Sequence, residues 1–292
     1  MTSSRAAWLF AAPALTVIVV FFLLPVAAAF VLSFTDFDLY ALADIRNLRF
    51  VGLENYTQLL SNPLFWKALG NTAWFVVLGV PLSIAASLAA ALLIHSKLAR
   101  APGIFRTAYF APVVTTLVAV AVVWRYIFHA RYGLLNYLLD GLGIDPVDWL
   151  GDPRWSMPSI VILAVWKNFG YNMIIFVAAL QSIPQDLYEA ARIDGSSSWQ
   201  ELRHVTLPML KPTFALVGIL TIAGYFQLFA EPYVMTEGGP LQSTVSVLYF
   251  MYNEGFKWWN LGSASAVAFV LFVIILVVTV IPVRLARQEP GR

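Results

Sequence analysis

Residues 183–212 read IPQDLYEAARIDGSSSWQELRHVTLPMLKP, a polar stretch between two long apolar segments. Pro184 stands where the first turn of a helix tolerates a missing N–H group. Gly195 stands where the end of a helix favours a left-handed residue. Between them Leu187, Tyr188 and Ala191 share one helical face, so the pattern predicts a short amphipathic helix.

A second short helix is expected in the same stretch. Ser198 and Glu201 have the spacing of a capping box, and the helix that they open is predicted to end at Pro208. A connection between two membrane spans needs only a few residues. Two capped helices therefore indicate a docking surface, and the alternative is an amphipathic loop that lies on the membrane.

Three short motifs in this stretch carry a resemblance to a known family. They are Glu189-Ala190-Ala191, Asp194-Gly195 and Leu207-Pro208. Together they resemble the EAA loop of membrane subunits of binding-protein-dependent ABC importers, in particular of the maltose-type carbohydrate branch. The resemblance implies a type I ABC importer permease fold, in which these seven residues contact a separate ATP-hydrolysing subunit and couple its closure to the spans.

The composition indicates a membrane protein. Of the 292 residues 60% are hydrophobic and 12% are charged, with a mean hydropathy of +0.76, whereas soluble domains carry about 25% charged residues. The net charge of +2 gives no reason to expect nucleic acid binding. The chain has no cysteine and no P-loop motif, so no disulfide, cofactor, metal site or ATPase activity of its own is expected.

Six segments are long enough to cross the roughly 30 Å of hydrocarbon in a bilayer. They lie near residues 8–34, 68–94, 107–128, 156–182, 212–231 and 261–285. The sequence thus predicts an all-α membrane protein with one transmembrane permease domain over residues 1–292 and a cytoplasmic coupling loop over residues 183–212. A cleaved signal peptide is the alternative for the first segment, but its apolar run exceeds the usual 7–15 residues of a signal core.

The placement of lysine and arginine predicts the orientation. One side collects Arg5, Lys97, Arg100, Arg106, Arg192, Arg203, Lys211, Arg284, Arg287 and Arg292. The other side collects Arg46, Arg49, Lys67, Arg125, Arg131, Arg154 and Lys257 in longer loops. Both termini and the 183–212 loop are therefore expected on the cytoplasmic side. The resemblance implies that the membrane is a bacterial cytoplasmic (inner) membrane.

The outer loops are expected to carry short surface helices at residues 53–61 and 134–139. Four tryptophans nearby are predicted to be anchors at the membrane interface. They are Trp149, Trp155, Trp258 and Trp259.

Polar residues near the centres of the fourth and fifth segments are candidates for a substrate site, because such residues are costly in a membrane. They are Lys167, Asn168, Tyr171, Asn172, Thr221, Tyr225 and Gln227. Amide, ammonium and aromatic groups suit a neutral sugar, and Lys167 would also suit an anionic one. The alternative is structural: Lys167 pairs with a carboxylate or carbonyl group on a neighbouring helix, and Tyr225 is packing. Glu231 is interpreted as an interfacial or capping residue.

The predicted function is that of a permease subunit of an ABC importer for a sugar, with a di- or oligosaccharide favoured. The partners implied by the resemblance are two ATP-binding subunits, a second permease subunit and an extracytoplasmic sugar-binding protein. An ion-coupled secondary transporter is the main alternative, but it needs acidic residues at mid-span. A membrane scaffold without transport gives no reason for the polar aromatic cluster in the fourth segment.

Overall fold

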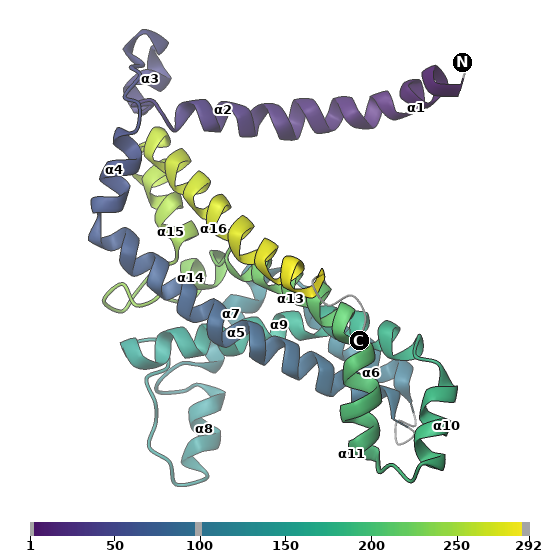
Figure 1. Ribbon diagram of the computed structural model, residues 1–292. Coiled ribbons are helices and arrows are strands. Elements are labelled where there is room, and N and C mark those ends of the chain that lie inside the picture. The colour runs from purple at the N-terminus through teal and green to yellow at the C-terminus, as the bar shows by residue number, and fades with distance from the viewer. Residues whose placement is uncertain (1–2, 97–100, 288–292) are drawn as a thin grey trace. The chain divides into compact units, whose positions relative to one another are not determined.

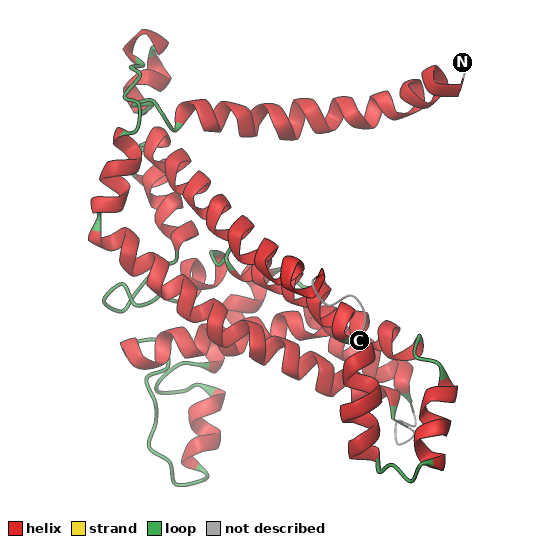
Figure 2. Ribbon diagram, viewed as in Figure 1, coloured by secondary structure: helices red, strands yellow, loops and turns green. Residues whose placement is uncertain are grey.

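The computed structural model describes residues 3–96 and 101–287, and within them the fold is all-α, as the sequence predicts (Figures 1 and 2). In chain order the helices are α1 (Ser3–Ile18), α2 (Leu24–Leu32), α3 (Leu39–Ala43), α4 (Glu54–Ser61), α5 (Pro63–His95), α6 (Pro102–Val114), α7 (Leu117–Ile127), α8 (Leu134–Asp140), α9 (Pro153–Gln181), α10 (Gln185–Ile193), α11 (Ser198–Glu201), α12 (Leu207–Met209), α13 (Lys211–Tyr225), α14 (Ala230–Met235), α15 (Val247–Tyr252) and α16 (Leu261–Arg287). Three π-helical turns are Val19–Leu23, Leu202–Thr206 and Asn253–Lys257, and Ile45–Asn47 is a 3₁₀ turn.

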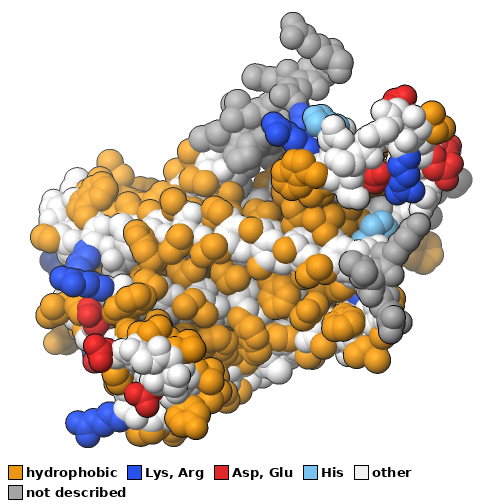
Figure 3. All heavy atoms as spheres, turned by 90° about the horizontal axis from the view of Figure 1, so that it is seen from below, with side chains coloured by type: hydrophobic (Ala, Val, Ile, Leu, Met, Phe, Trp, Pro, Cys, Tyr) orange, Lys and Arg blue, Asp and Glu red, His pale blue; other side chains and the backbone are white. Residues whose placement is uncertain are grey.

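Five helical segments of the described chain are long and apolar enough to cross a membrane. They are Trp8–Leu32, Pro63–His95, Pro153–Gln181, Lys211–Met235 and Leu261–Val280. The predicted third span is a bent pair instead, because α6 and α7 meet at an angle of 98°. Hydrophobic side chains predominate on the face in Figure 3, which suits a lipid environment.

By its contacts the chain divides into two compact units. The first comprises Met1–Trp66 and Phe250–Val273, and the second comprises Lys67–Tyr249 and Ile274–Arg292. The fourth and fifth predicted spans, which carry the candidate substrate residues, and the 183–212 loop all belong to the second unit. The second unit therefore holds both candidate sites.

A junction of buried polar contacts organises the first unit. The Asn55 side-chain amide donates to the carbonyl oxygens of Ser33 and Thr35 at 2.9 and 2.8 Å. The Gly262 N–H group donates to the carbonyl oxygen of Phe37 at 2.9 Å. A side chain at Gly262 would collide with the backbone oxygen of Thr35, so this position needs a glycine for close backbone approach.

Glu254 is a titratable group buried in this first unit, with 9% of its surface exposed. Burial raises the pKa of its carboxyl group, and hydrogen bonds from Ser263 and Asn260 oppose that rise. A group whose pKa is higher in the folded than in the unfolded protein binds more protons in the folded state. The free energy of unfolding should therefore increase as the pH falls from neutral through that raised pKa.

We expect Glu254→Gln to increase the thermal stability of the purified protein at pH 7.5, because the charged form no longer has to be buried. Thermal unfolding in detergent between pH 5 and 8 measures this. The variant should lose the part of the gain in melting temperature on acidification that Glu254 supplies. The effect of Asp36 can be told apart from that of Glu254. The backbone N–H group of Arg49 lowers the pKa of Asp36, so its contribution to the free energy of unfolding is lost only at more acidic pH. A variant that melts at a lower temperature than the wild type at pH 7.5 would refute this assignment.

In the second unit α6 packs along α9, and a hydrophobic core lies at the end of α9 near the 183–212 loop. Its buried members are Ala90, Ala91, Ile94, Met173, Phe176, Val177, Leu180, Ile183, Leu210 and Val217. Ile183 and Leu210 thus anchor both ends of the loop in the same core as α9 and α13.

The helices α8 and α4 confirm the two short helices predicted near residues 134–139 and 53–61. Buried Asn136 of α8 donates to the carbonyl oxygens of Ala130 and Val147, each at 2.8 Å. Its side-chain oxygen accepts from the Trp149 indole N–H group at 2.8 Å. Trp149 is buried, so its prediction as a membrane anchor was wrong. Its indole N–H group instead stabilises the loop that follows α8.

Candidate functional site

The first candidate site is the helical hairpin formed by α10 and α11, which stand side by side in Figure 1. α10 begins after Pro184 and ends in a Schellman motif. The N–H group of Ser196 donates to the carbonyl oxygen of Ala191 at 2.9 Å, and the N–H group of Gly195 donates to the carbonyl oxygen of Arg192 at 3.0 Å. Gly195 has a φ of +78°, which confirms the predicted left-handed turn.

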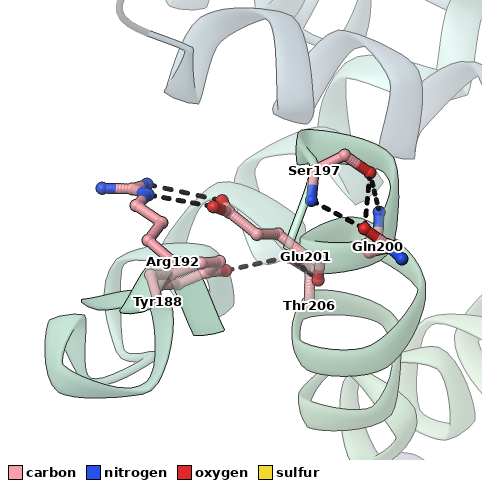
Figure 4. A network of polar contacts seen from close by, with 6 residues as sticks. All are labelled: Tyr188, Arg192, Ser197, Gln200, Glu201 and Thr206. Carbon is pink, nitrogen blue, oxygen red and sulfur yellow. Dashed lines mark hydrogen bonds and ion pairs between the residues drawn. The ribbon is translucent and has the colours of Figure 1, made fainter. Parts of the chain in front are cut away.

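The capping box of the second helix is shifted by one residue from the prediction. The Ser197 hydroxyl group accepts from the Gln200 N–H group, and the Gln200 side chain accepts from the Ser197 N–H group at 2.7 Å (Figure 4). The prediction of Ser198 and Glu201 was wrong because two overlapping capping patterns fit the three consecutive serines. Glu201 is used elsewhere in the hairpin.

Two side-chain contacts join the arms of the hairpin (Figure 4). Arg192 forms an ion pair with Glu201, with 2.9 Å between Nε and Oε1. This hydrogen bond raises the pKa of the Arg192 guanidinium above its ordinary value, so the pair stays charged. The Tyr188 hydroxyl group lies 2.9 Å from the buried Thr206 hydroxyl group. The exposed ion pair alone stabilises little, but together the two contacts fix the spacing of the arms.

The predicted stop at Pro208 was also wrong. The backbone continues from α11 through the π-helical turn Leu202–Thr206 and α12 into α13, with only Leu210 between them. A π-helical turn places an extra residue before the proline, which then occupies the first turn of α12, where its missing N–H group costs little. The hairpin is therefore joined directly to the fifth span.

The predicted coupling residues occupy the outer surface of the hairpin or its base. Glu189, Ala190, Asp194, Gly195 and Pro208 are exposed, whereas Ala191 and Leu207 are half-buried. Two further exposed apolar residues belong to the hairpin: Ile193 is 87% exposed and Trp199 is 66% exposed. The sequence analysis named neither of them, because the apolar face that it identified consists of Leu187, Tyr188 and Ala191. Large exposed apolar side chains beside a carboxylate favour a protein partner.

The second candidate site is a cavity of about 570 Å³ in the second unit. It lies where two spans break: α6 gives way to α7 after Val114, and α13 ends at Tyr225 before α14 begins. Breaks in spanning helices free backbone groups and leave space for a ligand. Its lining residues are Phe75, Val113, Leu117, Ala164, Asn168, Tyr171, Asn172, Leu220, Thr221, Gly224, Tyr225, Gln227, Leu228, Phe229, Ala230, Glu231 and Leu248.

Six of the seven predicted substrate residues line this cavity, and they come from α9, α13 and the segment that follows α13. The buried Asn172 side chain donates to the Thr221 hydroxyl group at 2.9 Å, so α9 and α13 are tied together at the cavity wall. The Tyr225 hydroxyl group is buried and forms no hydrogen bond of ordinary geometry with the described chain. The Tyr225 ring packs on Gly79 of α5, where a Cβ atom would lie 2.7 Å from it.

Lys167 is the predicted residue that the structure places outside the cavity lining. It is 7% exposed, and its Nζ atom donates to the carbonyl oxygen of Val113 at 3.1 Å. Val113 is in the last turn of α6, where carbonyl groups lack helical partners. Lys167 thus stabilises the break in the third span, as in the alternative structural interpretation.

Glu231 is the charged lining residue of the cavity, and the sequence analysis did not place it in the site. It was interpreted as an interfacial or capping residue, yet α14 has no side-chain cap and Glu231 is 7% exposed. A buried acid in a span was the available indication, and it was set aside because Glu231 stands near the end of the predicted segment.

The comparisons with known proteins agree with this architecture. The family model described as "binding-protein-dependent transport system inner membrane component" matches residues 83–288. The lactose transport system permease protein LacF of Rhizobium radiobacter is 40% identical over 278 residues, which cover 94% of this chain and 90% of that protein. The trehalose/maltose transport system permease protein MalF of Thermococcus litoralis is 34% identical over 287 residues, covering 97% and 94%.

A solved structure has the same fold. It is a bacterial alginate ABC transporter in complex with an alginate pentasaccharide-bound periplasmic protein. One of its chains matches with a TM-score of 0.81 and 21% sequence identity, covering 99% of this chain and 98% of that one.

Proposed function

Because the chain belongs to the family of binding-protein-dependent transport system inner membrane components, we propose that it is the permease subunit of an ABC importer for an oligosaccharide. Relatives named for lactose and for trehalose and maltose support the sugar class. The chain is a multi-pass membrane component of the transporter, and a partner chain hydrolyses the ATP.

One observation carries the mechanism: the two spans that supply the polar lining of the cavity are the two that the capped hairpin joins. Ile183 and Leu210 at the base of the hairpin are buried in one core with Leu180 of α9 and Val217 of α13. From Leu210 to Thr221 the helix rises by about 16 Å at 1.5 Å per residue. A displacement of the hairpin base is therefore carried rigidly to the Asn172–Thr221 contact at the cavity.

The proposed partners follow from this arrangement. The hairpin faces the cytoplasm, together with both termini, and seats in a surface groove of an ATP-binding subunit, of which the complex holds two. A second permease subunit supplies the other half of the pathway, since one chain of this size lines only one side. An extracytoplasmic binding protein delivers the sugar, which then contacts Asn168, Tyr171, Asn172, Thr221, Tyr225 and Gln227 in the cavity.

Reconstitution of the complete transporter in vesicles tests the proposal. With the ATP-binding subunits, the second permease and the binding protein present, uptake of labelled lactose, maltose or trehalose should require ATP on the cytoplasmic side. Collapse of the proton and sodium gradients should leave the uptake unchanged. Uptake that follows an ion gradient and persists without ATP would contradict the proposal and favour a secondary transporter.

A further inference from the structure

The carboxylate of Glu231 is buried in the cavity wall without a side-chain partner. Within residues 3–96 and 101–287 it accepts a hydrogen bond from its own backbone N–H group and forms no ion pair within 4.0 Å. It also caps no helix, because the cap position of α14 is Phe229. An ionised carboxylate can accept several hydrogen bonds, so one that lines a cavity with only its own backbone N–H group as a donor points to a ligand that donates hydrogen bonds.

The nearby cation does not neutralise this carboxylate directly. Lys167 interacts electrostatically with Glu231, but its Nζ atom is held by the carbonyl oxygen of Val113 and lies outside the lining. The ammonium group lowers the cost of burying the charge and leaves the carboxylate oxygens available to the cavity. Glu231 is then the single residue with a formal charge among those that line the cavity in the described chain.

The remaining lining suits a neutral, hydroxyl-rich molecule. Neutral hydrogen-bonding groups come from Asn168, Asn172, Thr221, Tyr225 and Gln227, and aromatic surfaces come from Phe75, Tyr171 and Phe229. Sugar hydroxyl groups donate to a carboxylate in charge-assisted hydrogen bonds, which are about twice as strong as neutral ones. A carboxylate or sulfonate group on the sugar would instead meet a like charge in a poorly solvated space, which opposes binding.

We propose that Glu231 accepts hydrogen bonds from sugar hydroxyl groups and makes the cavity select neutral sugars over acidic ones. The proposal rests on the proposed function, because it assumes that the cavity is the sugar site. It assigns to Glu231 a role in specificity and removes Lys167 as a contact for an anionic sugar.

Equilibrium binding to the purified complete transporter without the binding protein tests this inference, because the binding protein has a selectivity of its own. The probes are lactose, maltose and trehalose, each paired with the derivative in which one CH₂OH group is oxidised to a carboxylate. The wild type should bind each neutral sugar at least about tenfold more tightly than its acidic derivative, a difference of about 1.4 kcal/mol.

Three variants separate the contributions. Glu231→Gln should weaken binding of the neutral sugar about threefold to tenfold and reduce the preference below about threefold, because the like charge is gone. Glu231→Asp keeps the charge at a shorter reach, so it should retain the preference while weakening the neutral sugar. Glu237→Gln makes the same substitution at an exposed residue outside the cavity and should change neither quantity.

The outcomes distinguish this inference from the proposed function. A Glu231→Gln protein that binds neutral sugar with the full wild-type preference would overturn the specificity role and leave the sugar importer intact. The same holds for a wild type that binds the acidic derivative more tightly. A Glu231→Gln protein that fails to fold leaves the decision to the Glu231→Asp variant, whose loss of preference would overturn the inference. A wild type that binds no sugar and takes none up in vesicles would overturn both proposals.

Discussion

Replacing Glu189 by lysine is expected to abolish sugar uptake and the co-isolation of the ATP-binding subunit, while the chain still inserts into the membrane. Glu189 is exposed on α10 and forms no ion pair with another described residue, so its loss leaves the hairpin intact. In the proposed contact, however, the substitution reverses a charge that faces the partner. Juxtaposed like charges at an interface cost several kcal/mol, and each 1.4 kcal/mol is about tenfold in affinity.

Affinity purification from membranes, followed by quantification of the ATP-binding subunit, measures this effect. Asp140→Lys makes the same change of charge at an exposed residue of α8, outside the hairpin, and should co-isolate the subunit normally. Ile193→Glu should behave like Glu189→Lys, because it places a charge where an apolar side chain is 87% exposed. Normal sugar-stimulated ATP hydrolysis in the Glu189→Lys transporter would contradict the proposal that Glu189 contacts the ATP-binding subunit.

Replacing Gly170 by alanine is expected to be strongly destabilising, although alanine is the better helix former. A Cβ atom there would collide with the backbone oxygen of Tyr109 and lie 2.9 Å from its carbonyl carbon. The two helices would have to separate, since neither backbone atom can rotate away. Overpacking of this kind costs about 1–3 kcal/mol or more, and α6 would lose its close contact with α9.

The amount of folded protein after detergent extraction and its thermal unfolding temperature report this cost. Gly70→Ala is the matched control, because Gly70 is also in a helix and nothing lies within 4 Å of an added Cβ atom. That control should be neutral or slightly stabilising, by up to about 1 kcal/mol. If the Gly170→Ala and Gly70→Ala proteins unfold at the same temperature, the close approach of α6 and α9 is not what the structure indicates.

Local patterns in the sequence were sufficient for the hairpin in outline. Gly195 ends α10 in a left-handed conformation because few other residues adopt that backbone geometry without strain, so the prediction needed no tertiary information. The choice between Ser197 and Ser198 as the cap was different, because both serines have a suitable partner three residues later. Glu201 forms an ion pair with Arg192 instead of capping the helix, and that contact depends on how the two arms of the hairpin pack against each other.

The sequence predicted most of the polar residues that line the cavity, but not its apolar lining or its geometry. Six polar or aromatic residues of α9 and the fifth span line it as expected, because polar groups in a span usually face a cavity or another helix. Lys167 and Glu231 exchanged the roles expected of them. The exchange follows from the break after Val114: the carbonyl group of Val113, in the last turn before that break, binds the lysine, and no sequence pattern fixes where that carbonyl lies.

By itself the sequence determined the class of this protein: an all-α membrane chain, with apolar segments long enough to span a bilayer and a capped polar hairpin between the fourth and fifth. These properties follow from hydrophobicity, helix capping and backbone conformation, which act over a few neighbouring residues. Only the tertiary structure decided that α6 and α7 bend by 98°, that the hairpin runs directly into α13, and that Glu231 faces the cavity. Each depends on contacts between residues far apart in the chain, where packing and unsatisfied backbone groups outweigh local preference.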